Sequence, residues 1–519
     1  MLRYLCCIIM LVIYTTILNA QQSKTVSIFG IIQSYSKVDS IELVYHDYML
    51  SKSGLTPEPK RFYYLPRKGF YQGNAFKFEL PDVTRPGYIS LKYGINYFLH
   101  HYLIMPGDSV ELFFDLQKNQ TVFSGPAATA FKCQYELASI EIKQRFEKGS
   151  TLVTGNPDQF LNSEDNRSKW ERDMKEFGDY GKVLKIIPVN ANWQKQRLTN
   201  EFSFPASKDY LDVLDLYKKD LDTIRFAILK ADIIGKTYST LIYQFYNRLY
   251  SDAYMAKDSL AMKQLDSLYY KFIKPLPVNH VPDEIQAYSA YYTNYLLDKA
   301  IAECNAVERK MPVFELLKTR YSGSVRDKLV GKFLEYNYRY LPNGEKYLKE
   351  SLKFVKVPEV HAIISKIVTN QSKGAEAYNF RLKNEKGDWV RMEDFKGKVV
   401  LIDFWFTGCM PCKWFNKNTL KPVKSHFKDR DDLVIVSISI DKRFDTWIKS
   451  VKEGEYTSTD AVNLFTLGEG DEHPLIQHYD IQGYPSIMLI DKEGKIARTD
   501  NLNTSPDKLI PILEQQLAQ

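Results

Sequence analysis

The stretch of sequence that most restricts the fold of this chain is KVVLIDFWFTGCMPCKWF, at residues 398–415. Its first half is apolar apart from Lys398 and Asp403, which is typical of a strand buried on both faces of a sheet. Pro411 suits the first turn of a helix, because the N–H that it lacks would have no partner there. The stretch therefore predicts a buried strand, a turn and a helix, with Cys409 at the helix N-terminus and Cys412 one turn inside.

The two cysteines of this stretch allow three kinds of chemistry. Structural zinc needs four ligands, but Cys133 and Cys304 are isolated, and the eight histidines form no close pair on a helical face. A crosslink of Cys409 to Cys412 closes a very small loop and so removes little entropy from the unfolded chain. A helix N-terminus favours a thiolate by roughly 0.3–1 kcal/mol, and the thiolate is the form that attacks disulfides. Reversible redox chemistry is favoured over a metal site and over a structural disulfide, and no cofactor is predicted.

The N-terminal stretch MLRYLCCIIMLVIYTTILNA, residues 1–20, has one early cation followed by a short apolar run. This pattern predicts a secretory signal peptide, with an uncleaved membrane anchor as the alternative. Export would place the chain in the periplasm or cell envelope. Of the six cysteines, two lie in this stretch, and the four that remain are too few to form a disulfide framework in 519 residues.

The rest of the chain divides by the period of its apolar residues. Residues 21–122 contain β-branched and alternating runs such as TVSIFGII and AFKFEL, which predict an antiparallel β-sandwich. Residues 123–370 repeat apolar residues every three or four positions, which predicts an all-α region. A small, polar linker at 370–377 marks the start of the last region, residues 371–519. After this linker, strand and helix patterns alternate in the manner of an α/β domain.

The charge of the chain bears on whether it binds nucleic acid. The net charge of +7 is small for this length, and the basic residues are interspersed with acidic ones. The chain therefore shows no basic stripe of the kind that binds nucleic acid.

Three motifs in order resemble a known family. DFKGKVVLIDFWFTGCMPCK resembles the cysteine motif of the TlpA/ResA-like exported disulfide reductases, which belong to the thioredoxin superfamily. AYNFRLKNEKGDWVRMEDFKGK before it and YDIQGYPSIMLIDKEGKI after it resemble the opening and the proline segment of that family. The resemblance covers about residues 374–519 and implies a thioredoxin fold there. The β-rich region resembles the DUF4369-like domain that precedes thioredoxin domains in Bacteroidetes-type envelope proteins.

This resemblance implies roles for particular residues. Cys409 matches the attacking cysteine and Cys412 the resolving one, so the pair would form a redox disulfide. Trp405 matches an aromatic residue four positions before the first cysteine, and we predict that it binds substrate. Pro485 matches the cis-proline that faces the disulfide, and the backbone of Tyr484 would pair with the substrate strand.

Asp403 is the third predicted catalytic residue. Its apolar neighbours should desolvate the carboxyl group and raise its pKa. In thioredoxin an Asp at this spacing is the acid–base group near the inner sulfur; the alternative role is to brace a turn. The sequence departs from the family at Gly408, where a Trp is usual, at Phe415, where a Glu is common, and at Ser437, where thioredoxin has a lysine.

The leading hypothesis is a periplasmic oxidoreductase that reduces or exchanges disulfides of exported proteins. Such an enzyme would need a membrane electron donor, and its N-terminal domains would select partners or form a homodimer. The alternative is an envelope binding or scaffold protein with an accessory thioredoxin domain. A thiol peroxidase is disfavoured, because Ile402 stands seven residues before Cys409, where that class needs a proline.

Overall fold

The structure is a computed structural model. It describes residues 24–33, 40–48, 60–64, 67–68, 74–94, 96–116, 118, 120–147, 151–154, 157–179, 185–188, 207–245, 259–278, 281–306, 312–481 and 483–519. The chain forms two compact units, Met1–Leu316 and Leu317–Gln519. The predicted signal peptide lies outside the described residues. Within the described ranges, no helix is long and apolar enough to cross a bilayer.

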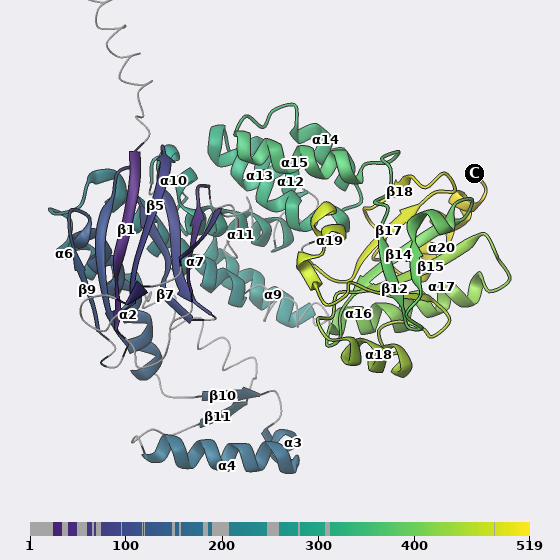
Figure 1. Ribbon diagram of the computed structural model, residues 1–519, viewed down its shortest axis with the longest axis horizontal. Helices are drawn as coiled ribbons and strands as arrows, with labels where there is room; N and C mark the ends of the chain where they lie inside the picture. The colour runs from purple at the N-terminus through teal and green to yellow at the C-terminus, as the bar shows by residue number, and fades with distance from the viewer. Residues whose placement is uncertain are drawn as a thin grey trace, which may run out of the picture. The chain divides into compact units, whose positions relative to one another are not determined.

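Two sheets form the β-rich part of the first unit, shown in purple and blue in Figure 1, with strand orders β4-β5-β1-β8-β9 and β3-β2-β6-β7. In β1, alternate residues from Val26 to Ile32 are buried, because successive side chains of a strand point to opposite faces. They share one core with residues of the second sheet such as Leu43 and Ile89, which makes the pair a sandwich. The strands are β1 (Lys24–Gln33), β2 (Ile41–His46), β3 (Lys60–Tyr64), β4 (Arg67–Lys68), β5 (Asn74–Val83), β6 (Gly87–Tyr93), β7 (Asn96–Ile104), β8 (Ser109–Asp115) and β9 (Gln120–Ser124).

The prediction of a purely antiparallel sandwich was wrong in one pair. Strands β1 and β8 run parallel, with Ser27 opposite Ser109. The chain crosses from one sheet to the other between β7 and β8, so β8 enters the first sheet in the same direction as β1. Gly30 allows this close pairing, because a Cβ there would clash with the carbonyl of Leu112 on β8.

Helices dominate the remainder of the first unit. The all-α prediction omitted one small sheet, formed by parallel strands β10 (Thr151–Thr154) and β11 (Lys185–Pro188), whose sequences are rich in β-branched residues. The helices are α2 (Ala128–Glu147), α3 (Pro157–Asn162), α4 (Glu164–Asp179), α6 (Ser207–Leu216), α7 (Thr223–Gln244), α9 (Ser259–Leu268), η2 (Tyr269–Ile273), α10 (Asp283–Tyr288) and α11 (Ala290–Ala306), and α12 (Val313–Arg320) spans the junction of the two units.

The second unit begins with a helical segment. It contains α13 (Gly323–Asn337), η3 (Tyr338–Tyr340), α14 (Gly344–Ser351) and α15 (Pro358–Gln371). The compact unit thus starts some fifty residues before the predicted linker at 370–377. Part of that linker is hydrogen-bonded to the following domain, since Gly374 N–H donates to Ile496 O at 2.8 Å and Ala377 N–H to Gly494 O at 3.0 Å. A domain boundary at residue 370 stays a prediction.

A seven-stranded sheet of order β13-β12-β16-β15-β14-β17-β18 is the centre of the second unit (Figure 1). Its strands are β12 (Arg381–Asn384), β13 (Trp389–Arg391), β14 (Val399–Trp405), β15 (Leu433–Ser439), β16 (Val462–Phe465), β17 (Ser486–Ile490) and β18 (Ile496–Arg498). Its helices are η4 (Met392–Phe395), α16 (Met410–Phe415), η5 (Asn416–Leu420), α17 (Lys421–His426), α18 (Phe444–Glu453), η6 (Gly470–Glu472), α19 (Pro474–His478) and α20 (Pro506–Leu517).

Helices cover both faces of this sheet. Val399 and Leu401 of β14 pack with residues of α16, α17 and α20 on one face. Val400 and Ile402 pack with residues of α19 on the other face. Strand β14 is buried along its whole length, as its apolar sequence predicts.

Candidate functional site

The two cysteines lie where β14 ends and α16 begins. Strand β14 pairs in parallel with β15 and antiparallel with β17, so its end is held from both sides. A three-residue turn follows, and Gly408 there has φ of 97°, a conformation that suits glycine. A tryptophan, which the family resemblance led us to expect at this position, would adopt this backbone conformation only with strain.

Cys409 and Cys412 form a disulfide in this structure, with their Cα atoms 5.2 Å apart. Cys409 is the N-cap of α16, and its Sγ accepts a hydrogen bond from the backbone N–H of Cys412 at 3.1 Å. Both side chains are nearly inaccessible, with Cys409 exposed by 4% and Cys412 by 2%. Their positions on the helix distinguish the two sulfurs, whereas their exposure in the disulfide form does not.

A hydrophobic cluster of four aromatic residues and one valine packs against the disulfide, and it consists of Trp405, Trp447, Val451, Tyr456 and Phe465. The ring of Trp405 stacks on Tyr456 with centroids 5.5 Å apart. Its indole N–H donates to the hydroxyl of Ser437 at 2.7 Å. Trp405 is fully buried, so in this form it presents no ring surface to a substrate.

Asp403 lies on the sheet face that bears the disulfide. Because side chains alternate along a strand, Asp403 shares a face with Leu401 and with Trp405, the residue under the disulfide. It is buried, and its Oδ1 has no hydrogen-bond partner among the residues that the structure describes. Burial raises the pKa of Asp403 to about 8. This is the direction that the apolar neighbours predicted.

Ser437 occupies the position opposite Asp403 on β15. Its hydroxyl oxygen accepts a hydrogen bond from the indole N–H of Trp405 at 2.7 Å. The neighbouring strand therefore supplies a neutral group at this position, where the related thioredoxin arrangement led us to look for a lysine. With no cation at that position, nothing on β15 offsets the effect of burial on the carboxyl group.

The loop before β17 adjoins the same cluster. The Tyr484–Pro485 peptide bond is cis. The ring of Tyr484 packs edge-on against Phe406 at 5.5 Å, and its hydroxyl donates to Asp471 at 2.8 Å. The pKa of Tyr484 is raised, first by burial and then by Asp471.

The backbone of Tyr484 is the second feature of this loop. Its N–H and C=O make no hydrogen bond to any residue within the described ranges. Ser486, two residues later, already pairs with Phe404 of β14. Unpaired backbone groups next to a sheet can accept an added strand.

One hydrogen-bond network at the site was not foreseen from the sequence. Asp441 follows β15, and its carboxylate accepts the Thr407 N–H at 3.0 Å and the Thr407 hydroxyl at 2.7 Å. The hydroxyl of Ser439 donates to the same carboxylate at 2.9 Å. These bonds hold the turn that precedes Cys409. A usable signal was present, because the ends of parallel strands meet at one edge of a sheet.

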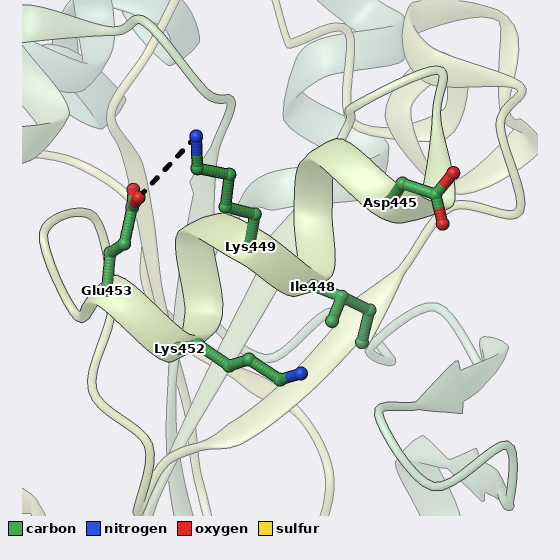
Figure 2. Close-up of a pocket in the computed structure, with 5 residues that line it drawn as sticks. All are labelled: Asp445, Ile448, Lys449, Lys452 and Glu453. Atoms are coloured by element: carbon green, nitrogen blue, oxygen red, sulfur yellow. Dashed lines mark ion pairs between the residues drawn. The ribbon is translucent and has the colours of Figure 1, made fainter.

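Figure 2 shows a shallow hollow on the surface of α18. Its lining consists of Asp445, Ile448, Lys449, Lys452 and Glu453. Lys449 and Glu453 form an ion pair at 3.9 Å between exposed groups. The hollow is formed by one helix and its charged side chains are exposed, so we assign no chemistry to it.

Known proteins resemble the part of the chain that contains the two cysteines. The model of a family described as "Thioredoxin-like" matches residues 397–496. The thiol-disulfide oxidoreductase ResA of Bacillus thuringiensis subsp. konkukian is 32% identical over 128 residues, which cover 24% of this chain and 67% of that protein. This chain belongs to the thioredoxin-like thiol-disulfide oxidoreductases.

Other members of the thioredoxin-like oxidoreductases match the same part of the chain. ResA of Bacillus subtilis is 29% identical over 128 residues, covering 24% of this chain and 66% of that protein. The matches thus span about two thirds of these relatives' own length. A crystal structure of the thioredoxin domain of a thiol-disulfide oxidoreductase from Bacteroides vulgatus is 33% identical and covers 28% of this chain and 96% of that domain, with a TM-score of 0.25.

Proposed function

We propose that this protein exchanges disulfides with exported proteins in the periplasm through Cys409 and Cys412. The observation that carries the proposal is the disulfide at the start of α16, with the Cys412 N–H directed at the Cys409 sulfur at 3.1 Å. After reduction, this N–H and the other unpaired amides of the first helical turn favour a thiolate at Cys409. A thiolate there is the nucleophile that disulfide exchange requires.

The reaction has two exchange steps. The Cys409 thiolate attacks one sulfur of the substrate disulfide, which forms a mixed disulfide and releases the other substrate sulfur as a thiolate. The Cys412 thiolate then attacks the Cys409 sulfur, re-forms the enzyme disulfide and releases the second substrate thiol. The substrate gains two electrons and the enzyme dithiol loses them. Each later turnover needs a dithiol donor, which we expect at the membrane.

Asp403 is the proposed proton acceptor for Cys412. A pKa of about 8 places the carboxyl group near the operating pH, where proton transfer is most effective in both directions. Its Oδ1, which has no partner in the part of the chain that the structure describes, leaves an acceptor site available inside the fold. Deprotonation of Cys412 would generate the thiolate that resolves the mixed disulfide.

The loop at Tyr484 and Pro485 is the proposed docking site for the substrate backbone. The N–H and C=O of Tyr484 can each form one hydrogen bond with an extended segment, which would lie beside the disulfide. Trp405 packs against the disulfide inside the fold. Because its ring is fully buried, we expect it to make no contact with the substrate. Dimerisation through the N-terminal domains stays a prediction.

Reduction of insulin disulfides, with dithiothreitol as the electron source, tests the proposal. We expect Cys409→Ser to abolish turnover and Cys412→Ser to accumulate a mixed disulfide. Cys133→Ser is the matched control, because Cys133 is buried in the first unit and burial raises the pKa of its thiol to about 12. Turnover that survives Cys409→Ser, or fails equally in Cys133→Ser, would contradict the proposal.

A further inference from the structure

The helical segment of the second unit touches the loop that carries Tyr484 and Pro485. This segment, residues 317–371, lies outside the part of the chain that matches the thioredoxin-like family, which begins at residue 397. Its residues belong nevertheless to the same compact unit as the sheet. The family comparison therefore gives no role to the contacts described next.

Arg339 of η3 holds the start of this loop. Its guanidinium donates to the carbonyl of Tyr479 at 2.5 Å and to that of Asp480 at 3.3 Å. These carbonyls directly follow α19, where a helix leaves acceptors without partners inside the helix. Arg339 is buried, so its charge is committed to this contact and is not a solvated surface group.

The end of α15 completes the attachment. The side-chain amide of Gln371 donates to the Tyr479 carbonyl at 2.6 Å, and its oxygen accepts from Arg339 at 2.6 Å. Asn370 donates to the carbonyl of His478 at 2.9 Å. Two separate elements of the helical segment thus fix the three residues from which the loop departs.

Tyr340 reaches the far end of the same loop. Its hydroxyl donates to the carbonyl of Pro485 at 3.5 Å, and it would lie 3.4 Å from a Cβ placed on Gly483. Burial of the hydroxyl end raises the pKa of Tyr340, so the group stays a donor at neutral pH. The side chain is still 42% exposed, so part of its ring faces solvent.

We propose that Tyr340 is a specificity-determining residue that forms one wall of the substrate groove beside Tyr484 and Pro485. This rests on the proposed function, in which an extended substrate segment pairs with the backbone of Tyr484. Such a segment would pass the exposed ring of Tyr340, because the hydroxyl of Tyr340 donates to the carbonyl of Pro485 and lies near the position that a Cβ of Gly483 would take. The preferred substrates are disulfides in extended chain segments that carry a large apolar side chain within two residues of the attacked cysteine.

The contacts of the loop also give Arg339 and Gln371 a role. They are positioning residues, since they hold the loop without facing the disulfide. Substitutions of Arg339 or Gln371 should therefore affect all substrates that pair with the loop to the same extent, whatever side chains the substrates carry. Tyr340 should instead distinguish one side chain from another.

Three disulfides separate these effects. Two are peptide disulfides that differ only in a Phe or an Ala beside the cysteine, and the third is hydroxyethyl disulfide, which has no backbone to pair. We expect the wild type to have the lower KM for the Phe peptide. Tyr340→Ala should lower kcat/KM for the Phe peptide, relative to hydroxyethyl disulfide, by about three- to tenfold, mainly through KM. Tyr340→Phe keeps the ring and should retain the preference.

The controls keep the result specific. Trp389→Ala removes another exposed aromatic ring, on β13 at the opposite edge of the sheet from β17 and β18, and should change none of the three ratios. Arg339→Lys keeps the charge but not the forked contact, and should raise KM for both peptides alike.

An equal loss of kcat/KM for both peptides in Tyr340→Ala, or an unchanged preference for the Phe peptide, would overturn the role of Tyr340. Reduction of hydroxyethyl disulfide would still establish the oxidoreductase activity. A wild type that reduces none of the three disulfides would overturn the proposed function itself, and this proposal with it. The two failures are therefore distinguishable in one set of measurements.

Discussion

Two buried aspartates, one in each compact unit, differ in how their carboxyl groups are satisfied. Asp232 on α7 accepts hydrogen bonds from the hydroxyls of Tyr88 at 2.9 Å and Ser289 at 2.5 Å. Asp403 on β14 keeps one oxygen without a partner among the described residues. A satisfied buried carboxyl group stabilises its surroundings, whereas an unsatisfied one lowers stability and stays available for proton transfer. Asp232 thus serves structure in the first unit, whereas the carboxyl group of Asp403 in the second unit is the one that we propose for proton transfer.

The largest expected effect is on stability in the first unit. Asp232→Ala leaves the hydroxyls of Tyr88 and Ser289 buried without their acceptor, so we expect the free energy of unfolding of that unit to fall by about 3 kcal/mol. Urea unfolding measures this change, with the exposed Asp215→Ala as control. Disulfide exchange should stay within twofold of the wild type. A stable Asp232→Ala variant would remove the contrast between the two aspartates.

The next effect is on the rate of resolution in the second unit. Asp403→Asn removes the proton acceptor, so we expect release of the mixed disulfide to slow by about 100-fold. Attack by Cys409 should be nearly unchanged, because that thiolate is stabilised by the start of α16. Single-turnover kinetics separate the two steps, and Asp232→Asn is the matched control in the other unit. If resolution keeps its wild-type rate in Asp403→Asn, then Asp403 only braces the strand.

The smallest effect, taken over any one pH unit, is a slope of stability with pH. The pKa of Asp403 is about 8 in the folded protein, above its ordinary value of 3.8, so the folded state binds the extra proton between these values. Stability of the second unit should therefore fall as pH rises from about 4 to about 8, by at most about 1.4 kcal/mol per pH unit. Asp403→Asn should remove this part of the slope, as thermal unfolding at several pH values can show. A slope that is the same in both proteins would mean that Asp403 is ionised in the folded state throughout this range.

Much of the site could be predicted from the sequence because its signals are local. The apolar run before Cys409 indicates a buried strand, and Pro411 indicates the start of a helix; both effects act over a few residues. The expected rise in the pKa of Asp403 follows from its neighbours along the same strand. Each of these predictions needs only the period and chemistry of one segment.

The features that could not be predicted join residues far apart in the chain. The contact of Arg339 with Tyr479 depends on how separate elements pack, and no local period encodes it. The parallel pairing of β1 with β8 has the same origin. The burial of Trp405 depends on the helix and strands that close over it.

The sequence by itself determined the chemistry of this protein, since a cysteine pair between a buried strand and a proline-started helix favours redox exchange wherever it occurs. The tertiary structure decided the surroundings of the groups that we propose for that chemistry. It left one carboxyl oxygen of Asp403 without a partner among the described residues, buried Trp405 against the disulfide, and brought Tyr340 of the helical segment to the loop of Tyr484. The physical reason is that burial and hydrogen bonding are properties of the packed chain, whereas the type and spacing of residues are already present before it folds.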